Sequence, residues 1–240
     1  MVTTLHHPGR PVPLRLRFPR AGSAVRLAIA MSHDDSGWRR VLAHAGVYEA
    51  VQQILGGRRS VERYVREQVR PVPGVRILDV GCGPASILDV LPPDVIYTGY
   101  DANPAYVEHA RRRYGDRAEF SCARVGQGGR HPDAGHFDVV MTNSLLHHLH
   151  DDEVRTLTAA AQDHLRPGGV LVTIDPVHTN DAPWIARRLV AMDRGGAVRT
   201  AEQYRSLLAE GFDRVEDRVV TDLLRVPYAH YLARASRTAG

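Results

Sequence analysis

Apolar residues in this 240-residue chain gather in short runs that alternate with segments of helical periodicity. Seven runs have the length and composition of buried strands. They lie at 75–80, 95–100, 118–122, 137–142, 170–174, 214–220 and 224–230. Helices are expected from Pro84, at 104–114 with Asn103 as N-cap and Gly115 at the end, and at 151–165, 183–192 and 201–208.

Strands that alternate with helices predict a largely parallel sheet covered on both faces. The last two strands are separated by too few residues for a helical crossover, so this pair is expected to be antiparallel. Before the sheet, apolar residues recur at helical spacing from Trp38 to Val69, with a break at Gly56–Gly57. The pattern therefore divides the chain into a tail (1–37), a helical segment that serves as a lid (38–70) and one α/β domain (71–240).

The formal charge of +4 suggests a nucleic-acid partner until the charge is located along the chain. Residues 1–30 hold five arginines and no acidic residue, so the other 210 residues carry a net charge of −1. The proline-rich tail is expected to be disordered, and a neutral body makes nucleic acid an unfavoured partner. Two cysteines provide neither a disulfide framework nor a metal site, and no apolar run reaches the length of a membrane span. We expect a cytoplasmic protein.

The stretch RILDVGCGPAS (76–86) joins the first strand to a glycine turn. In a doubly wound sheet this turn borders the ligand site, and glycine lets the backbone approach a ligand closely. A dinucleotide would need a third glycine where Ser86 stands, and the carboxylate of Asp79 would repel its phosphates. The same acid favours S-adenosylmethionine, which carries an ammonium and a sulfonium group and no phosphate. Asp101, at the end of the second strand, suits a ribose diol of either ligand.

Four stretches resemble, in order and spacing, the motifs of class I S-adenosylmethionine-dependent methyltransferases. They are VRILDVGCGPA (75–85), YTGYDANP (97–104), FDVVMTNSLLHHL (137–149) and LRPGGVLVTID (165–175). The resemblance implies a doubly wound, Rossmann-like α/β fold with a seven-stranded, mostly parallel sheet and an antiparallel last strand. It also implies a substrate-covering insert at about 176–200 and S-adenosyl-L-methionine as cofactor.

By the same resemblance, Asp79 and the glycine turn would surround the methionine moiety, and Asp101 would hold the ribose hydroxyls. The complete set of implied cofactor residues is Tyr48, Asp79, Gly81, Cys82, Gly83, Asp101, Ala102, Asn103, Arg124, Val125, Asn143, Ser144 and His148. Arg124 departs from the family, which often has an acid there to receive the adenine amino group. Gln127 or a backbone group would then take that role.

The acceptor side of the site is less specified by the sequence. His147 and His148 are candidate general bases, although the LLHHL stretch is also frequent where no proton is moved. The candidate substrate contacts are His147, Asp175, His178, Arg194, Arg199 and Tyr228. The arginines would pair with an anionic substrate group, while a solvated basic face is the simpler interpretation.

We expect methyl transfer to a small-molecule acceptor through an oxygen, nitrogen or carbon nucleophile, by in-line displacement. Two other functions stay open: a non-methylating reaction such as cyclisation or decarboxylation on the same fold, and methylation of RNA. Dimerisation through the helices that precede the sheet is also left open.

Overall fold

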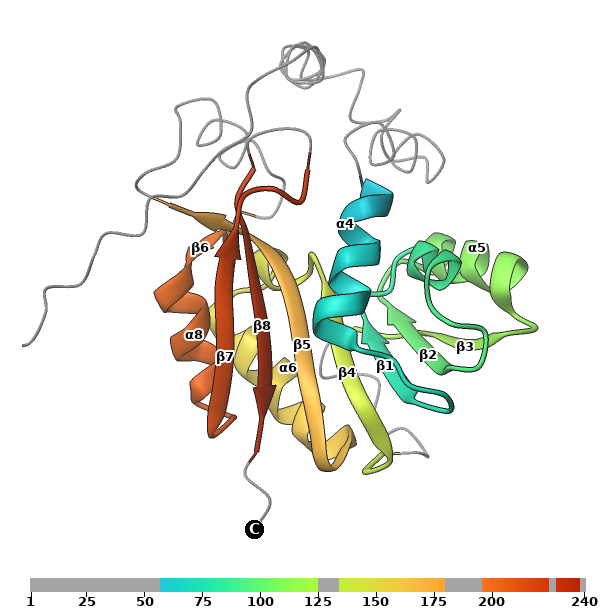
Figure 1. Ribbon diagram of the computed structural model, residues 1–240. Helices are drawn as coiled ribbons and strands as arrows, with labels where there is room; N and C mark the ends of the chain where they lie inside the picture. Colours follow the sequence, from blue (N-terminus) through green and yellow to red (C-terminus); the bar gives the residue numbers. More distant parts are fainter. Residues whose placement is uncertain (1–56, 125–133, 180–195, 225–227, 238–240) are drawn as a thin grey trace, which may run out of the picture.

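One mixed β-sheet forms the centre of the protein (Figure 1). A computed structural model describes residues 57–124, 134–179, 196–224 and 228–237. The strands are β1 (Arg76–Val80), β2 (Ile96–Asp101), β3 (Ala118–Cys122), β4 (Phe137–Asn143), β5 (Leu165–His178), β6 (Arg199–Thr200), β7 (Arg214–Val220) and β8 (His230–Ser236). The helical elements are α4 (Gly57–Tyr64), the π-helix η1 (Val65–Val69), the 3₁₀ helices η2 (Ser86–Asp89) and η3 (Leu146–His148), α5 (Pro104–Tyr114), α6 (Asp151–His164) and α8 (Ala201–Ala209).

The strand order is β3-β2-β1-β4-β5-β8-β7, and the two-residue β6 pairs with β5 outside this path. β8 runs antiparallel to both β5 and β7, and the other pairs are parallel. The predicted mostly parallel sheet with an antiparallel last strand is therefore confirmed. The order reverses between β1 and β4, so the carboxyl ends of β1, β2, β4 and β5 share one edge at a topological switch point, where such sheets bind ligands.

Three elements differ most from the sequence prediction: β5 (Leu165–His178) is longer than the strand expected at 170–174, and β8 and η2 have other bounds. The last strand was expected at 224–230 but is β8, at His230–Ser236. β8 is hydrogen-bonded on both sides, and proline cannot donate to a sheet ladder, which explains why the strand begins after Pro227. The helix expected from Pro84 is only the four-residue η2, because the pair Pro92–Pro93 follows closely and prolines end a helix.

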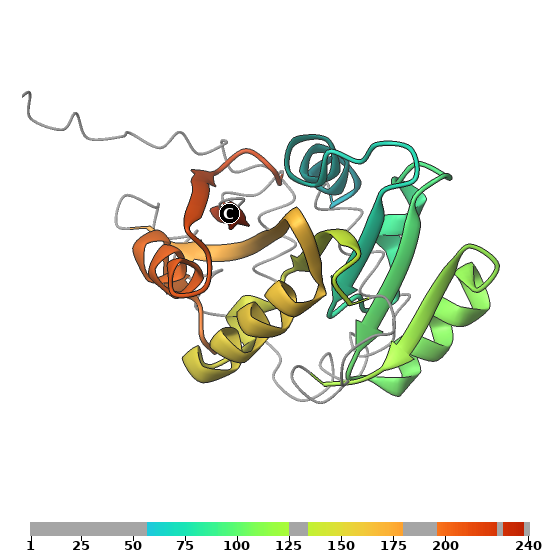
Figure 2. The same ribbon diagram turned by 90° about the horizontal axis from the view of Figure 1, so that it is seen from below.

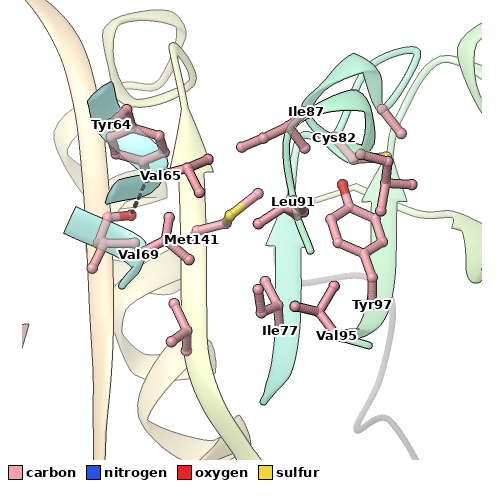
Figure 3. Packing of buried hydrophobic residues seen from close by; sticks show 14 of the residues in the cluster. Tyr64, Val65, Val69, Ile77, Cys82, Ile87, Leu91, Val95, Tyr97 and Met141 are labelled. Carbon is pink, nitrogen blue, oxygen red and sulfur yellow. Dashed lines mark hydrogen bonds between the residues drawn. The ribbon is translucent and has the colours of Figure 1, made fainter. Parts of the chain in front are cut away.

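Each face of the sheet carries its own apolar cluster. Residues of α4, η1, η2 and α5 pack against one face, and residues of α6 and α8 pack against the other. Figure 2 shows α4 and α6 on opposite sides of β4 and β5. In the first cluster, Tyr64 and Val65 approach Met141 from one side, while Ile87 and Leu91 approach from the other (Figure 3).

The described part of the helical segment before the sheet packs directly on the strands. Tyr64 is fully buried, and its hydroxyl donates to the carbonyl oxygens of Thr142 and Val172 at 3.3 and 3.4 Å. The Ser60 hydroxyl donates to the Leu223 carbonyl oxygen. Residues 57–69 are thus part of the core. Residues 38–56 of the predicted lid lie outside the described residues, as does the predicted helix at 183–192.

Candidate cofactor and acceptor site

The glycine turn after β1 folds over the end of β2. The backbone N–H groups of Gly81 and Cys82 both donate to the Tyr100 carbonyl oxygen, at 2.7 and 2.9 Å. The φ angles of Gly81 and Gly83 are +77° and +55°, a left-handed conformation that favours glycine. This conformation turns the chain back toward β2 within three residues, which explains the glycines in the motif.

Asp101 fastens this turn to the start of α5. Its Oδ2 accepts from the Gly83 N–H at 2.8 Å, and its Oδ1 accepts from the Asn103 N–H at 2.7 Å. Asn103 in turn caps α5 by accepting from the Ala105 N–H at 2.9 Å. A carboxylate oxygen accepts more than one hydrogen bond, so both oxygens keep capacity for a ligand hydroxyl.

Asp79 is a buried acid that lacks a cationic partner among the described residues. It is 2% exposed; its Oδ2 accepts from the Tyr97 hydroxyl at 2.6 Å, and its Oδ1 is buried with no hydrogen-bond partner. Burial raises the pKa of this carboxyl from 3.8 to about 7. The Tyr97 hydrogen bond opposes that rise, and the negative charge of Asp101 adds to it. The orphaned oxygen indicates a missing donor, and a cation would satisfy it best.

The three residues of the glycine turn have different surroundings. A Cβ on Gly83 would enter open space, whereas a Cβ on Gly81 would meet the Leu145 side chain at 3.0 Å. Cys82 is buried against Gly99, where an added Cβ would lie 2.9 Å from the Cys82 sulfur. Burial also raises the pKa of the Cys82 thiol. Cys82 is therefore a packed residue, Gly81 allows close packing of the next turn, and Gly83 borders free space.

The turn after β4 carries backbone strain. Ser144 has a φ of +56°, although it has a Cβ, and its N–H donates to the Ile174 carbonyl oxygen at 2.8 Å. Ala85, in the turn after β1, has a φ of +58°. Strain of this kind costs about 1 kcal/mol or more and gathers at functional sites. Two of the three strained non-glycine residues in the described chain thus flank the switch point between β1 and β4.

A buried histidine–aspartate pair joins the turn after β4 to the end of β5. Nδ1 of His147 lies 2.8 Å from Oδ1 of Asp175, and the His147 backbone N–H donates to the same oxygen at 3.1 Å. Oδ2 of Asp175 accepts from the Thr173 hydroxyl at 2.6 Å, and that hydroxyl accepts from Thr142 at 2.8 Å. Since a carboxylate only accepts, this hydrogen bond places a proton on Nδ1 of His147.

His148 and His178 differ from this pair in exposure. The ring centroid of His148 lies 4.0 Å from that of His147, but its side chain is exposed. His178 is also exposed, at the end of β5. Asp175 was expected to contact substrate, but its side chain is 0% exposed and accepts hydrogen bonds from His147 instead.

Arg199 was expected to recognise an anionic substrate, and the structure places it elsewhere. The residue is 6% exposed, and all five guanidinium N–H groups are directed at protein acceptors. Because no donor is left for a substrate, we remove Arg199 from the substrate contacts.

The remaining predicted residues are only partly accessible to a structural test. Tyr48, Val125 and Arg194 lie outside the described residues. Ala102 and Arg124 are exposed after β2 and β3, and the ring centroid of the half-buried Tyr228 lies 5.1 Å from that of His230.

Three contributors to the site were missed in the sequence: Tyr97, Thr142 and Thr173. Tyr97 pairs with Ile77, two residues before Asp79, so the register of β1 and β2 brings it to that acid. Thr142 and Thr173 are register partners on β4 and β5. The alternation of β-strand side chains could have found them only once this register was known.

The strand order, the glycine turn and the buried acid form an α/β fold whose switch point suits a cationic, phosphate-free nucleoside ligand. η2 is too short to offer a helix N-terminus to a pyrophosphate. A model of a methyltransferase domain matches residues 78–171. This match and the strand order support a class I S-adenosylmethionine-dependent methyltransferase with S-adenosylmethionine as its cofactor.

Three similar proteins place this assignment in context. Carboxy-S-adenosyl-L-methionine synthase of Campylobacter curvus is 26% identical over 58% of this chain and 70% of its own length. Malonyl-[acyl-carrier protein] O-methyltransferase of Legionella pneumophila is 32% identical over 43% of this chain and 37% of its own length. The crystal structure of the plantazolicin methyltransferase BpumL, in complex with a triazolic desmethylPZN analog and S-adenosylhomocysteine, has a TM-score of 0.61 and 15% identity. The match covers 89% of this chain and 96% of the BpumL chain. At 15% identity, it shows a shared fold.

The residues present fit the cofactor. The unpartnered Oδ1 of Asp79 is an acceptor for its ammonium group, and the oxygens of Asp101 are acceptors for ribose hydroxyls. The open space beside Gly83 leaves the turn accessible to a ligand. Within the described residues, no helix is long and apolar enough to cross a membrane.

Proposed function

We propose that the protein methylates a small-molecule acceptor whose nucleophile must lose a proton, either a hydroxyl or an acidic C–H group. The observation that carries this proposal is the buried pair His147–Asp175 at the carboxyl edge of β4 and β5. When bound, the cofactor supplies an electrophilic methyl group. An amine acceptor would need little help from a base, so a tautomerically fixed imidazole points to a more acidic nucleophile.

His147 is the proposed base. Asp175 accepts a hydrogen bond from Nδ1, and its carboxylate would stabilise the positive charge that forms when His147 takes a proton. His148 is the alternative, since its exposed ring reaches solvent more readily. Asp79, the glycine turn and Asp101 bind and orient the cofactor, so that acceptor and methyl group meet in line.

An isotope experiment tests the reaction. The protein is incubated with a small-molecule extract and S-adenosylmethionine that carries a ¹³C-labelled methyl group, and the products are followed by mass spectrometry. Labelled products that require active protein support methylation. His147→Gln should remove them and His148→Gln should keep them; the reverse result would assign the base to His148. Complete absence of label from every product would refute the proposal.

A non-methylating reaction is the second candidate. The matched protein from Campylobacter curvus is named a carboxy-S-adenosyl-L-methionine synthase, so its name describes a modified cofactor as product. The same incubation separates the two: a non-methylating enzyme would yield unlabelled products of altered mass, or a modified cofactor, without S-adenosylhomocysteine.

The substrate-covering role of residues 176–200 and the lid at 38–56 remain part of this proposal. So does the assignment of His178, Arg194 and Tyr228 to the acceptor side. RNA and a dimer partner stay as predictions, with salt-dependent RNA binding as the test of the former.

A further inference from the structure

Arg199 makes a set of contacts that the cofactor and acceptor roles do not explain. Its Nη1 donates to the carbonyl oxygens of Leu146 and Ala197 at 2.9 and 3.1 Å. Its Nη2 donates to the Leu149 carbonyl oxygen at 2.7 Å and to Oδ1 of Asp151 at 2.6 Å. Nε donates to the same Asp151 oxygen at 2.9 Å. A single buried guanidinium thus donates hydrogen bonds to three segments of the chain: the turn after β4, the start of α6 and the residues before β6.

The acceptors of Arg199 bracket the two histidines. Leu146 precedes the pair and Leu149 follows it, and both carbonyl oxygens are bound by the same side chain. The Ala197 N–H, two residues before Arg199, donates to the His147 carbonyl oxygen at 3.1 Å. The segment 197–199 therefore binds the backbone of the histidine turn at three residues, Leu146, His147 and Leu149, while Asp175 binds the His147 ring.

Arg199 is itself fixed in place. Its backbone belongs to β6, which pairs with β5 at Val177. The guanidinium lies over the Tyr204 ring at 5.6 Å from the centroid, and the Tyr204 hydroxyl donates to the Pro176 carbonyl oxygen at 3.2 Å. β5 also carries Asp175. One strand therefore supports both the acid that binds the His147 ring and the arginine that binds its backbone.

We propose that Arg199 is a positioning residue, which holds the turn 146–149 so that Nδ1 of His147 stays on Asp175. This inference rests on the proposed function for its catalytic meaning. Arginine is required because its planar fork offers five donors in fixed directions, whereas the lysine ammonium offers three donors from one point. A lysine at this position would leave buried carbonyl oxygens without donors, and the turn would move to find them.

Imidazole NMR of the full chain with ¹⁵N-labelled histidine tests this role without an acceptor or a cofactor. The ring signals report which nitrogen of His147 carries the proton and how fast that proton exchanges with water; His147→Gln assigns them. We expect the parent protein to show a protonated Nδ1. In Arg199→Lys, the proton should exchange at least about tenfold faster, which corresponds to one lost charge-assisted hydrogen bond, and the Nε2-protonated tautomer should become visible.

Arg205→Lys is the matched control, because Arg205 also pairs with a carboxylate through two nitrogens but its side chain is exposed and bound to Asp217 on β7. This control should leave the His147 signals unchanged. A folded Arg199→Lys variant whose His147 tautomer and proton exchange match those of the parent would overturn the proposal.

Asp151→Asn provides a second route if Arg199→Lys does not fold. The Asp151 side chain is 60% exposed, so its loss is tolerable, yet it removes the charged acceptor of two Arg199 donors. Exchange of the His147 proton should accelerate here too, by a smaller factor, and an unchanged rate would refute the role of Arg199. Labelled methyl transfer tests the proposed function separately, since a shift in the His147 signals requires no reaction.

Discussion

Asp79 offers a test of the cofactor site that depends on a single proton. Burial, together with the charge of Asp101, raises the pKa of Asp79 to about 7 against the opposing hydrogen bond from Tyr97. A folded-state pKa above the unfolded value of 3.8 means that the folded protein retains a proton that the unfolded chain releases. The stability that this proton contributes is present below about pH 4 and is lost as the pH rises through about 7.

The size of this loss follows from the shift. About three pKa units at about 1.4 kcal/mol each amount to roughly 4 kcal/mol for a fully buried group. Asp79→Asn keeps the shape of the side chain and removes its charge. We therefore expect the cofactor-free Asp79→Asn protein to be more stable than the parent at pH 8 and closer to it at pH 5, as measured by denaturant unfolding.

Cofactor binding should have the opposite dependence on pH. The ammonium group favours the ionised carboxylate, so below pH 7 binding must first release a proton. The affinity should fall about tenfold between pH 8 and pH 6, and about nine-tenths of a proton should leave per ligand at pH 6. Calorimetric titration with S-adenosylhomocysteine in buffers of different ionisation enthalpy measures both quantities.

The Asn variant separates the role of this carboxylate from general effects of pH. Asp79→Asn should weaken binding at pH 8 by a factor of about 10 to 100, the cost of one charge-assisted hydrogen bond, and should abolish the pH dependence. If parent and variant show the same slope between pH 6 and 8, Asp79 is not the group that meets the ammonium, and the reasoning from its orphaned oxygen fails.

Three further predictions concern the rest of the site. Asp101→Ala removes the acceptor of two backbone N–H groups and should abolish detectable binding of S-adenosylhomocysteine in calorimetry; unchanged affinity would exclude a ribose contact. Gly99→Ala places a Cβ 2.9 Å from the Cys82 sulfur and 3.0 Å from Cδ1 of Phe120, and should cost about 1–3 kcal/mol of unfolding free energy. Adding Cys82→Ala should restore only the part due to the sulfur. Asp175→Asn and His147→Gln should each reduce labelled methyl transfer. The double variant should transfer methyl as fast as His147→Gln alone, because both residues act on one proton. Additive losses of rate would count against the pair.

Most residues of the candidate cofactor site could be predicted from short stretches of sequence. Asp79 and Gly83 lie within a few residues, and Asp101 follows one strand later, so a short motif with its spacing specifies their meeting. The strand prediction matched the observed bounds even for the partly exposed β3 and β7. It failed at β8, since the aromatic residues near Tyr228 suggested a strand and the exclusion of proline from a doubly paired strand was given too little weight.

The acceptor half depended on distant contacts. His147 and Asp175 are 28 residues apart, and their pairing follows from the register of β4 and β5 together with the direction of the turn. Arg199 was misjudged for a related reason: its partners are mostly backbone carbonyl oxygens, which every residue possesses and no sequence pattern displays. From the sequence alone, an arginine near the end of a strand suggests an anion-binding site, and only the structure shows that carbonyl oxygens bind it instead.

The two buried carboxylates lie on opposite faces of the sheet. Asp79 points to the same face of the sheet as Ile77, two residues before it, and Ile77 packs with α4 and α5. Asp175 points to the same face as Val177, which packs with α6 and α8. Two buried negative charges on one face would raise each other's pKa values, and each would compete for the cofactor cation. With the sheet between them, Asp79 would be available to the ammonium group of the cofactor while Asp175 binds the His147 imidazole. Under the proposed function, an acceptor bound at the carboxyl edge of the strands would contact His147 without displacing a ligand of Asp79.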